Sequence, residues 1–245
     1  MDSPGYIVLS RMVAQTRTTA VLAHNMANAD TPGFQVERPI YASFEAKDAL
    51  RRGSEAARSV DYSWDRATWR DTTAGPLQQT GNPLDLALPG DGLFVVETPR
   101  GERYTRAGHF ALDATGRVVT QEGYPVLNTN SRPLTVAPGD SQLTVAADGT
   151  LSSQNGPIGR IRVVRFENPQ RLQAEGDRLF AAADAPAEVA RPGIVEGALE
   201  GSNVRPIMEI TRMTDELREF QMTAQFADKE GERLQGAIDR ILKRR

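Results

Sequence analysis

The chain has 245 residues, contains no cysteine and carries a formal net charge of −3 at pH 7. A surface that tracks nucleic-acid phosphates needs a clear basic excess, so we expect no nucleic-acid partner. The lack of thiols excludes disulfides, thiolate nucleophiles and zinc sites of the cysteine type. The sequence contains no run of about 18 apolar residues and does not open with a basic and apolar leader, so it predicts neither a transmembrane segment nor a cleavable signal peptide.

The first predicted element is a helix from about residue 4 to residue 28, with Pro4 in a first turn that tolerates proline. Its small and apolar residues are spaced alternately three and four positions apart, which is the period of a coiled-coil seam. These residues are Tyr6, Leu9, Val13, Thr16, Ala20, Ala23 and Ala27. Because several of them are only Ala or Thr, self-burial cannot hold this helix alone in water, and we expect it to need a partner.

The helix must end near Pro32, which lacks an amide donor and biases Thr31 away from the α conformation, while Gly33 permits a positive φ. Residues 33–80 show no sustained hydrophobic period. We therefore predict a connector with extended or short-strand structure over these residues.

From residue 81 to residue 190 the pattern changes to short β-branched or aromatic runs separated by Gly, Asn, Asp or Pro, which predicts an antiparallel β domain. Tight hairpins are expected at Asp148-Gly149 and between Asp113 and Gly116. Residues 191–202 are expected to form a return linker. The predicted strands are Leu93–Glu97, Arg103–Thr105, His109–Leu112, Arg117–Thr120, Leu134–Val136, Leu143–Val145 and Ile161–Phe166.

The last predicted element is a long helix within residues 203–245, with Ser202 and Asn203 as candidate caps and Pro206 in the first turn. Its seam positions are Ile210, Met213, Leu217, Phe220, Ala224, Ala227, Gly231, Leu234, Ile238 and Ile241. A helix of about 38 residues within this range measures roughly 55–60 Å, too long for a compact monomer of this size to bury. The sequence thus predicts a segmented, elongated α+β chain with helices at both ends.

Catalytic and ligand-binding signals are weak. Neither His24 nor His109 has a second histidine or carboxylate at metal-ligand spacing, and the glycines form no phosphate loop. We therefore predict no catalytic, metal or cofactor site and no cofactor. Two other functions stay open from the residues alone, namely a glycan-binding or glycan-cleaving β module and an independent coiled-coil dimerisation protein.

Three stretches carry a resemblance to a known family. His24–Phe34 resembles the Asn-Asn-Leu-Ala-Asn-x-x-Thr-x-Gly-Phe signature near the N-terminus of bacterial flagellar rod and hook proteins, although His24 replaces the usual Asn. Leu199–Val204 is similar to the Leu-Glu-x-Ser-Asn-Val that begins their C-terminal helix. Residues 80–110 are similar to the motif of their middle domain. The order is that of the family, and within it the chain resembles the proximal-rod members most and the distal-rod members next.

The resemblance implies a non-enzymatic subunit of the basal-body rod in the periplasm, which transmits torque to the hook. It further implies that residues 1–32 and 203–245 pair as a coiled-coil-like domain and assemble with copies of the chain and other rod subunits. Export would proceed through the flagellar type III apparatus without a cleavable signal. The residues expected at subunit interfaces are Asn25, Asn28, Thr31, Gly33, Phe34, Ser202, Asn203, Val204, Leu217, Phe220, Leu234 and Ile238.

Overall fold

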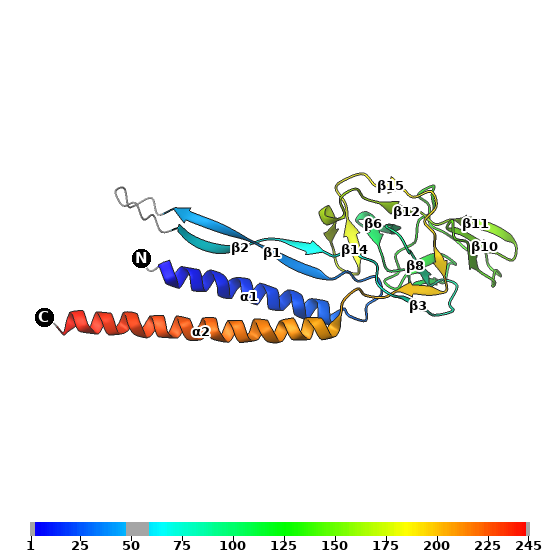
Figure 1. Ribbon diagram of the computed structural model, residues 1–245. Helices are drawn as coiled ribbons and strands as arrows, with labels where there is room; N and C mark the ends of the chain where they lie inside the picture. Colours follow the sequence, from blue (N-terminus) through cyan, green and yellow to red (C-terminus); the bar gives the residue numbers. More distant parts are fainter. Residues whose placement is uncertain (1–2, 48–58, 244–245) are drawn as a thin grey trace. The chain divides into compact units, whose positions relative to one another are not determined.

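The computed structural model describes residues 3–47 and 59–243 (Figure 1). By internal contacts the chain divides into two compact units. The helical unit comprises Met1–Ala27, Glu37–Arg70 and Arg205–Arg245, and the β-rich unit comprises Asn28–Val36 and Asp71–Val204. An N-terminal helix, a C-terminal helix and a middle antiparallel β-rich region confirm the predicted α+β class.

In the helical unit, α1 (Ser3–Ala27) lies beside α2 (Pro206–Leu242), and both helices are as long as their patterns predict (Figure 1). Proline in the first turn of each helix costs no hydrogen bond, because the first amides of a helix have no intrahelical acceptor. Within the part of the chain that the structure describes, neither helix combines the length and apolar character needed to cross a membrane.

The predicted connector contains two strands, β1 (Glu37–Lys47) and β2 (Ser59–Arg70), which are much longer than we expected. They pair antiparallel from Glu37 opposite Arg70 to Lys47 opposite Ser59. The ribbon packs on α1, where the hydroxyl of Tyr41 donates to the carbonyl of Ala14 at 2.8 Å. This support explains the length, since an isolated two-stranded ribbon is only marginally stable in water.

The β-rich unit is built of short antiparallel strands. Its largest sheet has the order β13 (Gln173–Ala174), β14 (Leu179–Ala181), β6 (Gly101–Thr105), β5 (Leu93–Thr98), β12 (Val163–Arg165) and β15 (Ala187–Glu188). A three-stranded sheet contains β11 (Gly156–Arg160), β10 (Thr150–Ser153) and β9 (Thr144–Val145). The remaining pairs are β16 (Val195–Glu196) with β4 (Leu86–Ala87), β17 (Ala198–Glu200) with β3 (Leu77–Gln79), and β7 (Phe110–Leu112) with β8 (Val118–Thr120).

Both predicted hairpins are confirmed. Strands β7 and β8 pair around Gly116, and β9 and β10 pair around Gly149, and both glycines have the positive φ that their turns require. The stretch Leu134–Val136 differs from the prediction, because it pairs through an isolated bridge from Thr135 to Arg117 instead of a strand.

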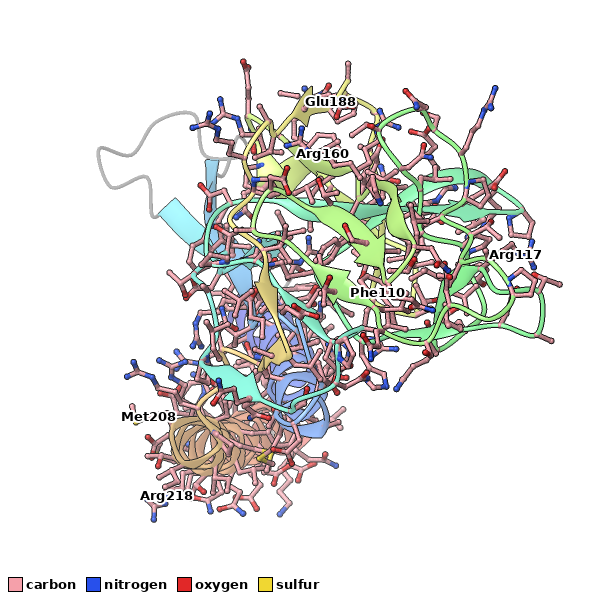
Figure 2. The ribbon with its side chains drawn as sticks, turned by 90° about the vertical axis from the view of Figure 1, so that its right-hand side faces the viewer. Phe110, Arg117, Arg160, Glu188, Met208 and Arg218 are labelled. Atoms are coloured by element: carbon pink, nitrogen blue, oxygen red, sulfur yellow. The ribbon has the colours of Figure 1, made fainter. Side chains whose placement is uncertain are left out.

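The core of this unit is formed by side chains from several of its sheets. Phe94 and Phe110 are almost fully buried and meet edge to face, with ring centroids 5.2 Å apart. Figure 2 shows Phe110 inside the unit and Arg117 and Glu188 at its surface. This packed core holds the segments of the β-rich unit that contribute to the site described below.

Candidate functional site

Asn25, in the last two turns of α1, is fully buried and binds the start of β1. Its Oδ1 accepts the amide of Glu37 at 2.9 Å, and its Nδ2 donates to the carbonyl of the same residue at 2.8 Å. A side-chain amide that satisfies both backbone groups of one residue fixes the position of that strand. Asn25 therefore holds the chain where it re-enters the helical unit.

Glu209, in the first turn of α2, was not among the predicted residues, yet its side chain is 1% exposed. Its carboxylate accepts Nδ2 of Asn25 at 3.3 Å, Arg38 at 3.2 Å and Arg212 at 3.0 Å. A buried carboxylate is tolerated only when it is paired in this way. Glu209 thus joins α1, β1 and α2 through one polar cluster.

Asn203 has the same role in the β-rich unit that Asn25 has in the helical unit, because its side-chain amide binds backbone groups of other segments. Its Oδ1 accepts the amide of Val36 at 2.7 Å, and its Nδ2 donates to the carbonyls of Asp71 and Thr73, each at 2.9 Å. The amide of Asn203 donates to the carbonyl of Phe34 at 3.3 Å. One side chain therefore ties together three separate segments of this unit.

The prediction that Ser202 and Asn203 cap α2 is wrong. The helix begins at Pro206, and the Ser202 hydroxyl accepts the amide of Val204 at 3.2 Å, ahead of the helix. Ser202 and Val204 are both buried. Sequence spacing alone could not distinguish a helix cap from a residue that hydrogen-bonds neighbouring segments, because Ser and Asn are common in both roles.

The predicted exit motif is brought together with the return segment. Thr31 donates its amide to the carbonyl of Asn28 and its hydroxyl to the Asn28 side chain, both at 3.2 Å, and Phe34 donates its amide to Thr31. Gly33 has a φ of +71° and donates to the carbonyl of Glu200 at 2.8 Å. A Cβ there would lie 2.7 Å from the amide nitrogen of Ala107. Gly33 is therefore required both by its conformation and by this close approach.

A buried ion pair supports this segment, and sequence reasoning missed it. Arg106 donates to Glu200 at 2.5 Å and to the carbonyls of Leu88, Gly90 and Gly92 at 2.6–2.7 Å. Both charged side chains are at most 6% exposed. Arg106 lies between the predicted strands Arg103–Thr105 and His109–Leu112, in a stretch that also contains Glu102, Arg103 and His109, so no local pattern marked it as buried.

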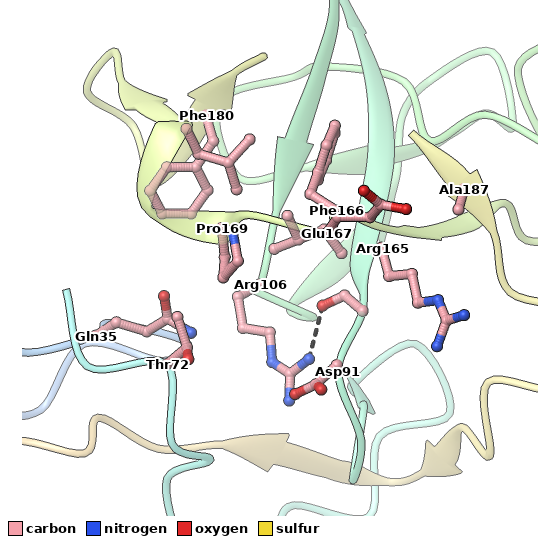
Figure 3. Close-up of a pocket in the computed structure, with 13 residues that line it drawn as sticks. Gln35, Thr72, Asp91, Arg106, Arg165, Phe166, Glu167, Pro169, Phe180 and Ala187 are labelled. Atoms are coloured by element: carbon pink, nitrogen blue, oxygen red, sulfur yellow. Dashed lines mark hydrogen bonds between the residues drawn. The ribbon is translucent and has the colours of Figure 1, made fainter. Parts of the chain in front are cut away.

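Arg106 also lines a pocket of about 440 Å³ in the β-rich unit (Figure 3). Phe166, Phe180 and Pro169 lie on one side of it, with Gln35 and Thr72 on another. Outside this pocket, His109 contacts buried Asp85 at 2.6 Å. Within residues 3–47 and 59–243, no group of three His, Asp or Glu side chains is arranged to hold a metal ion.

The predicted seam residues have different positions on α2. Phe220 and Leu234 are half-buried, Leu217 is exposed, and the side chain of Ile238 lies outside the described residues. Arg11 of α1 pairs with Glu219 of α2 at 2.9 Å. On α1, all seven residues of the predicted stripe are exposed, so this stripe is not the face that α1 presents to α2.

Comparison with known proteins decides the family. A model of the flagella basal body rod protein matches residues 6–35, one of the flagellar hook protein FlgE/F/G D1 domain matches 87–153, and one of the flagellar basal body rod FlgEFG protein C-terminal matches 195–240. The FlgF rod protein of Caulobacter vibrioides is 36% identical over 98% of both chains. The chain belongs to the flagellar basal-body rod protein family.

Further rod relatives agree. The FlgF protein of Salmonella typhimurium is 36% identical over 91% of both chains, and the FlgG protein of Bacillus subtilis is 31% identical over 89% of this chain and 91% of its own length. These rod relatives do not favour FlgG over FlgF. Like them, the chain is a structural protein rather than an enzyme. The predicted interface residues all fall within the matched terminal segments of this rod family.

Proposed function

We propose that this chain is an FlgF-type subunit of the proximal rod of the flagellar basal body, and that its terminal helices join copies of the chain and other axial proteins into a torque-transmitting shaft. Membership of the rod family supports the structural role and the basal-body location. Transit through the type III export apparatus without a cleavable signal is part of the same proposal. The proposal also keeps the predicted domain boundaries. These are a terminal helical domain of residues 1–32 with 203–245, a connector of residues 33–80, a β domain of residues 81–190 and a return linker of residues 191–202.

The exposed stripe of α1 carries the proposal. Tyr6, Leu9 and Val13 are 57–63% exposed, although they are large apolar residues on one face of a helix. Thr16, Ala20, Ala23 and Ala27 continue the same face with small side chains that permit a second helix to approach closely. An apolar helix face that its own chain leaves open is typical of a protein-protein interface.

Helix α2 offers apolar residues on both sides of its contact with α1. Ile210 and Leu217 are seven positions apart and share one flank, with exposures of 49% and 48%. Met222 and Phe226 are four positions apart and share the other flank, with exposures of 61% and 54%. Figure 2 shows Met208, which is also exposed, pointing outward from α2. Two such flanks suit a helix with a neighbour on each side, as in a tube built by heterologous contacts.

We infer that α1 and α2 pair in a coiled-coil-like manner. The half-buried positions Met213, Phe220 and Leu234 are separated by multiples of seven residues on α2, which supports this. A glycan-binding β module is not favoured, because the match to the FlgF protein of Caulobacter vibrioides covers 98% of the chain, including the β-rich unit.

The assembly role is tested by placing acid on the exposed stripe. We expect the double substitution Leu9→Glu and Val13→Glu to change the free energy of unfolding of the free chain by less than about 1 kcal/mol, because both sites are exposed. Rod incorporation and swimming should be lost, because a carboxylate buried without a partner costs several kcal/mol.

Swimming on soft agar and quantification of the chain in purified basal bodies provide the measurement. The matched control is Leu112→Glu on β7, where an apolar residue is 40% exposed in the β-rich unit, and it should retain wild-type swimming. Wild-type incorporation of the doubly substituted chain would show that the stripe is not an assembly surface.

A further inference from the structure

Gln15 is an unusual residue in α1. It is 6% exposed, and neither polar atom of its side chain has a hydrogen-bond partner among the described residues. Leaving a buried amide without partners is destabilising, and native proteins contain few such groups. Nearby Val21 and Leu22 are buried apolar residues of the same helix, so an apolar residue at position 15 would suit the packing better.

Two contacts between the helices give the level of Gln15 along α1 and α2. Arg11 pairs with Glu219 at 2.9 Å, and Asn25 donates to Glu209 at 3.3 Å, so the helices run antiparallel. Gln15 follows Arg11 by one turn, and Glu216 precedes Glu219 by one turn. Gln15 and Glu216 are therefore at the same level of the helix pair.

The carboxylate of Glu216 is also in an unfavourable environment. Burial raises the pKa of its carboxyl above the ordinary value, the charge of Glu219 raises it further, and Arg11 lowers it only in part. A half-buried carboxylate thus shares this level of the helix pair with an amide that lacks partners. A stable coiled coil would place leucine at such buried positions, so two polar groups at this level disfavour tight packing of α1 in the helical unit.

We propose that Gln15 is a specificity-determining residue for assembly, which keeps α1 weakly docked on α2 in the free chain so that α1 can repack against a second copy of the chain. This inference rests on the proposed rod function. A polar residue in a helix interface can specify the assembled arrangement at a cost in stability. A chain whose terminal helices closed tightly on each other would hold α1 in its monomeric position and resist that repacking.

Amide hydrogen exchange of the free chain tests the first half of the proposal. Gln15→Met removes the amide while preserving length and volume, and we expect it to slow exchange in α1 about tenfold, because local opening becomes less favourable. The matched control is Gln225→Met on the exposed part of α2, which should leave exchange in α1 unchanged. Unchanged or faster α1 exchange in the Gln15→Met chain would overturn the proposal.

Competition during assembly tests the second half. When wild-type and Gln15→Met chains are produced together with distinguishable tags, we expect the substituted chain to be at least about threefold depleted from purified basal bodies. Equal incorporation, despite slower exchange, would also overturn the proposal. Failure of the rod function is distinguishable, because wild-type chain would then be absent from basal bodies whatever its exchange rates.

Discussion

Arg106→Ala is expected to destabilise the β-rich unit by about 3–5 kcal/mol, the cost of removing one partner of a buried ion pair. The substitution leaves the Glu200 carboxylate buried at 4% exposure without its cation. It also leaves the carbonyls of Leu88, Gly90 and Gly92 without the donors that the guanidinium supplied. Calorimetric unfolding of the purified chain measures the loss.

Two variants separate charge from geometry at this position. Arg106→Lys keeps the charge but cannot reach four acceptors with one ammonium group, so we expect it to recover only a minor part of the loss. Arg165→Ala is the matched control, because Arg165 is an exposed arginine of the same pocket wall, and its removal should cost less than about 0.5 kcal/mol. A loss below about 1 kcal/mol for Arg106→Ala would contradict the structural role of the ion pair.

Gly33→Ala is expected to cost at least about 3 kcal/mol and to abolish swimming. A non-glycine residue in the left-handed region costs about 1 kcal/mol or more, and overpacking against fixed backbone adds a further 1–3 kcal/mol. Here the new Cβ would meet the backbone of Arg106 and Ala107 at 2.7 Å. The strain would fall on the segment that hydrogen-bonds Glu200 and Asn203.

Gly81→Ala provides the control for conformation alone. Gly81 has a φ of +76°, close to that of Gly33, but beyond its chain neighbours no atom lies within 4 Å of the position that a Cβ would occupy. We expect a loss of only about 1 kcal/mol in urea unfolding and normal swimming. If both alanine variants lost equal stability, the close approach at Gly33 would have no energetic weight.

Local chemistry allowed much of the fold to be predicted. Proline, glycine and hydrophobic period placed both helices and the β7/β8 and β9/β10 turns, because these features act through neighbouring residues. The length of β1 and β2 was missed, since it depends on support from α1 that residues 37–70 do not encode by themselves. The single bridge at Thr135 likewise reflects pairing between distant segments.

In the candidate site too, the motif residues could be predicted from the sequence, whereas their partners could not. Asn25 and Asn203 were identified from their motifs, but their partners Glu37, Val36 and Asp71 emerge only from the fold. Arg106 and Glu200 are 94 residues apart, and no local pattern joins them. The stripe of α1 was recognised from its period, yet period cannot tell a face that packs on its own chain from one left open for another.

The central claim is that this open face of α1 becomes buried in the rod, and thiol labelling tests it most directly. The chain contains no cysteine, so Val13→Cys introduces a single reactive site. We predict that a maleimide labels it rapidly in the free chain, where Val13 is 63% exposed, and at least about tenfold more slowly in purified basal bodies. Leu112→Cys on β7 serves as the control in the same preparations. Equal labelling of Val13→Cys in free chain and basal bodies would contradict the claim.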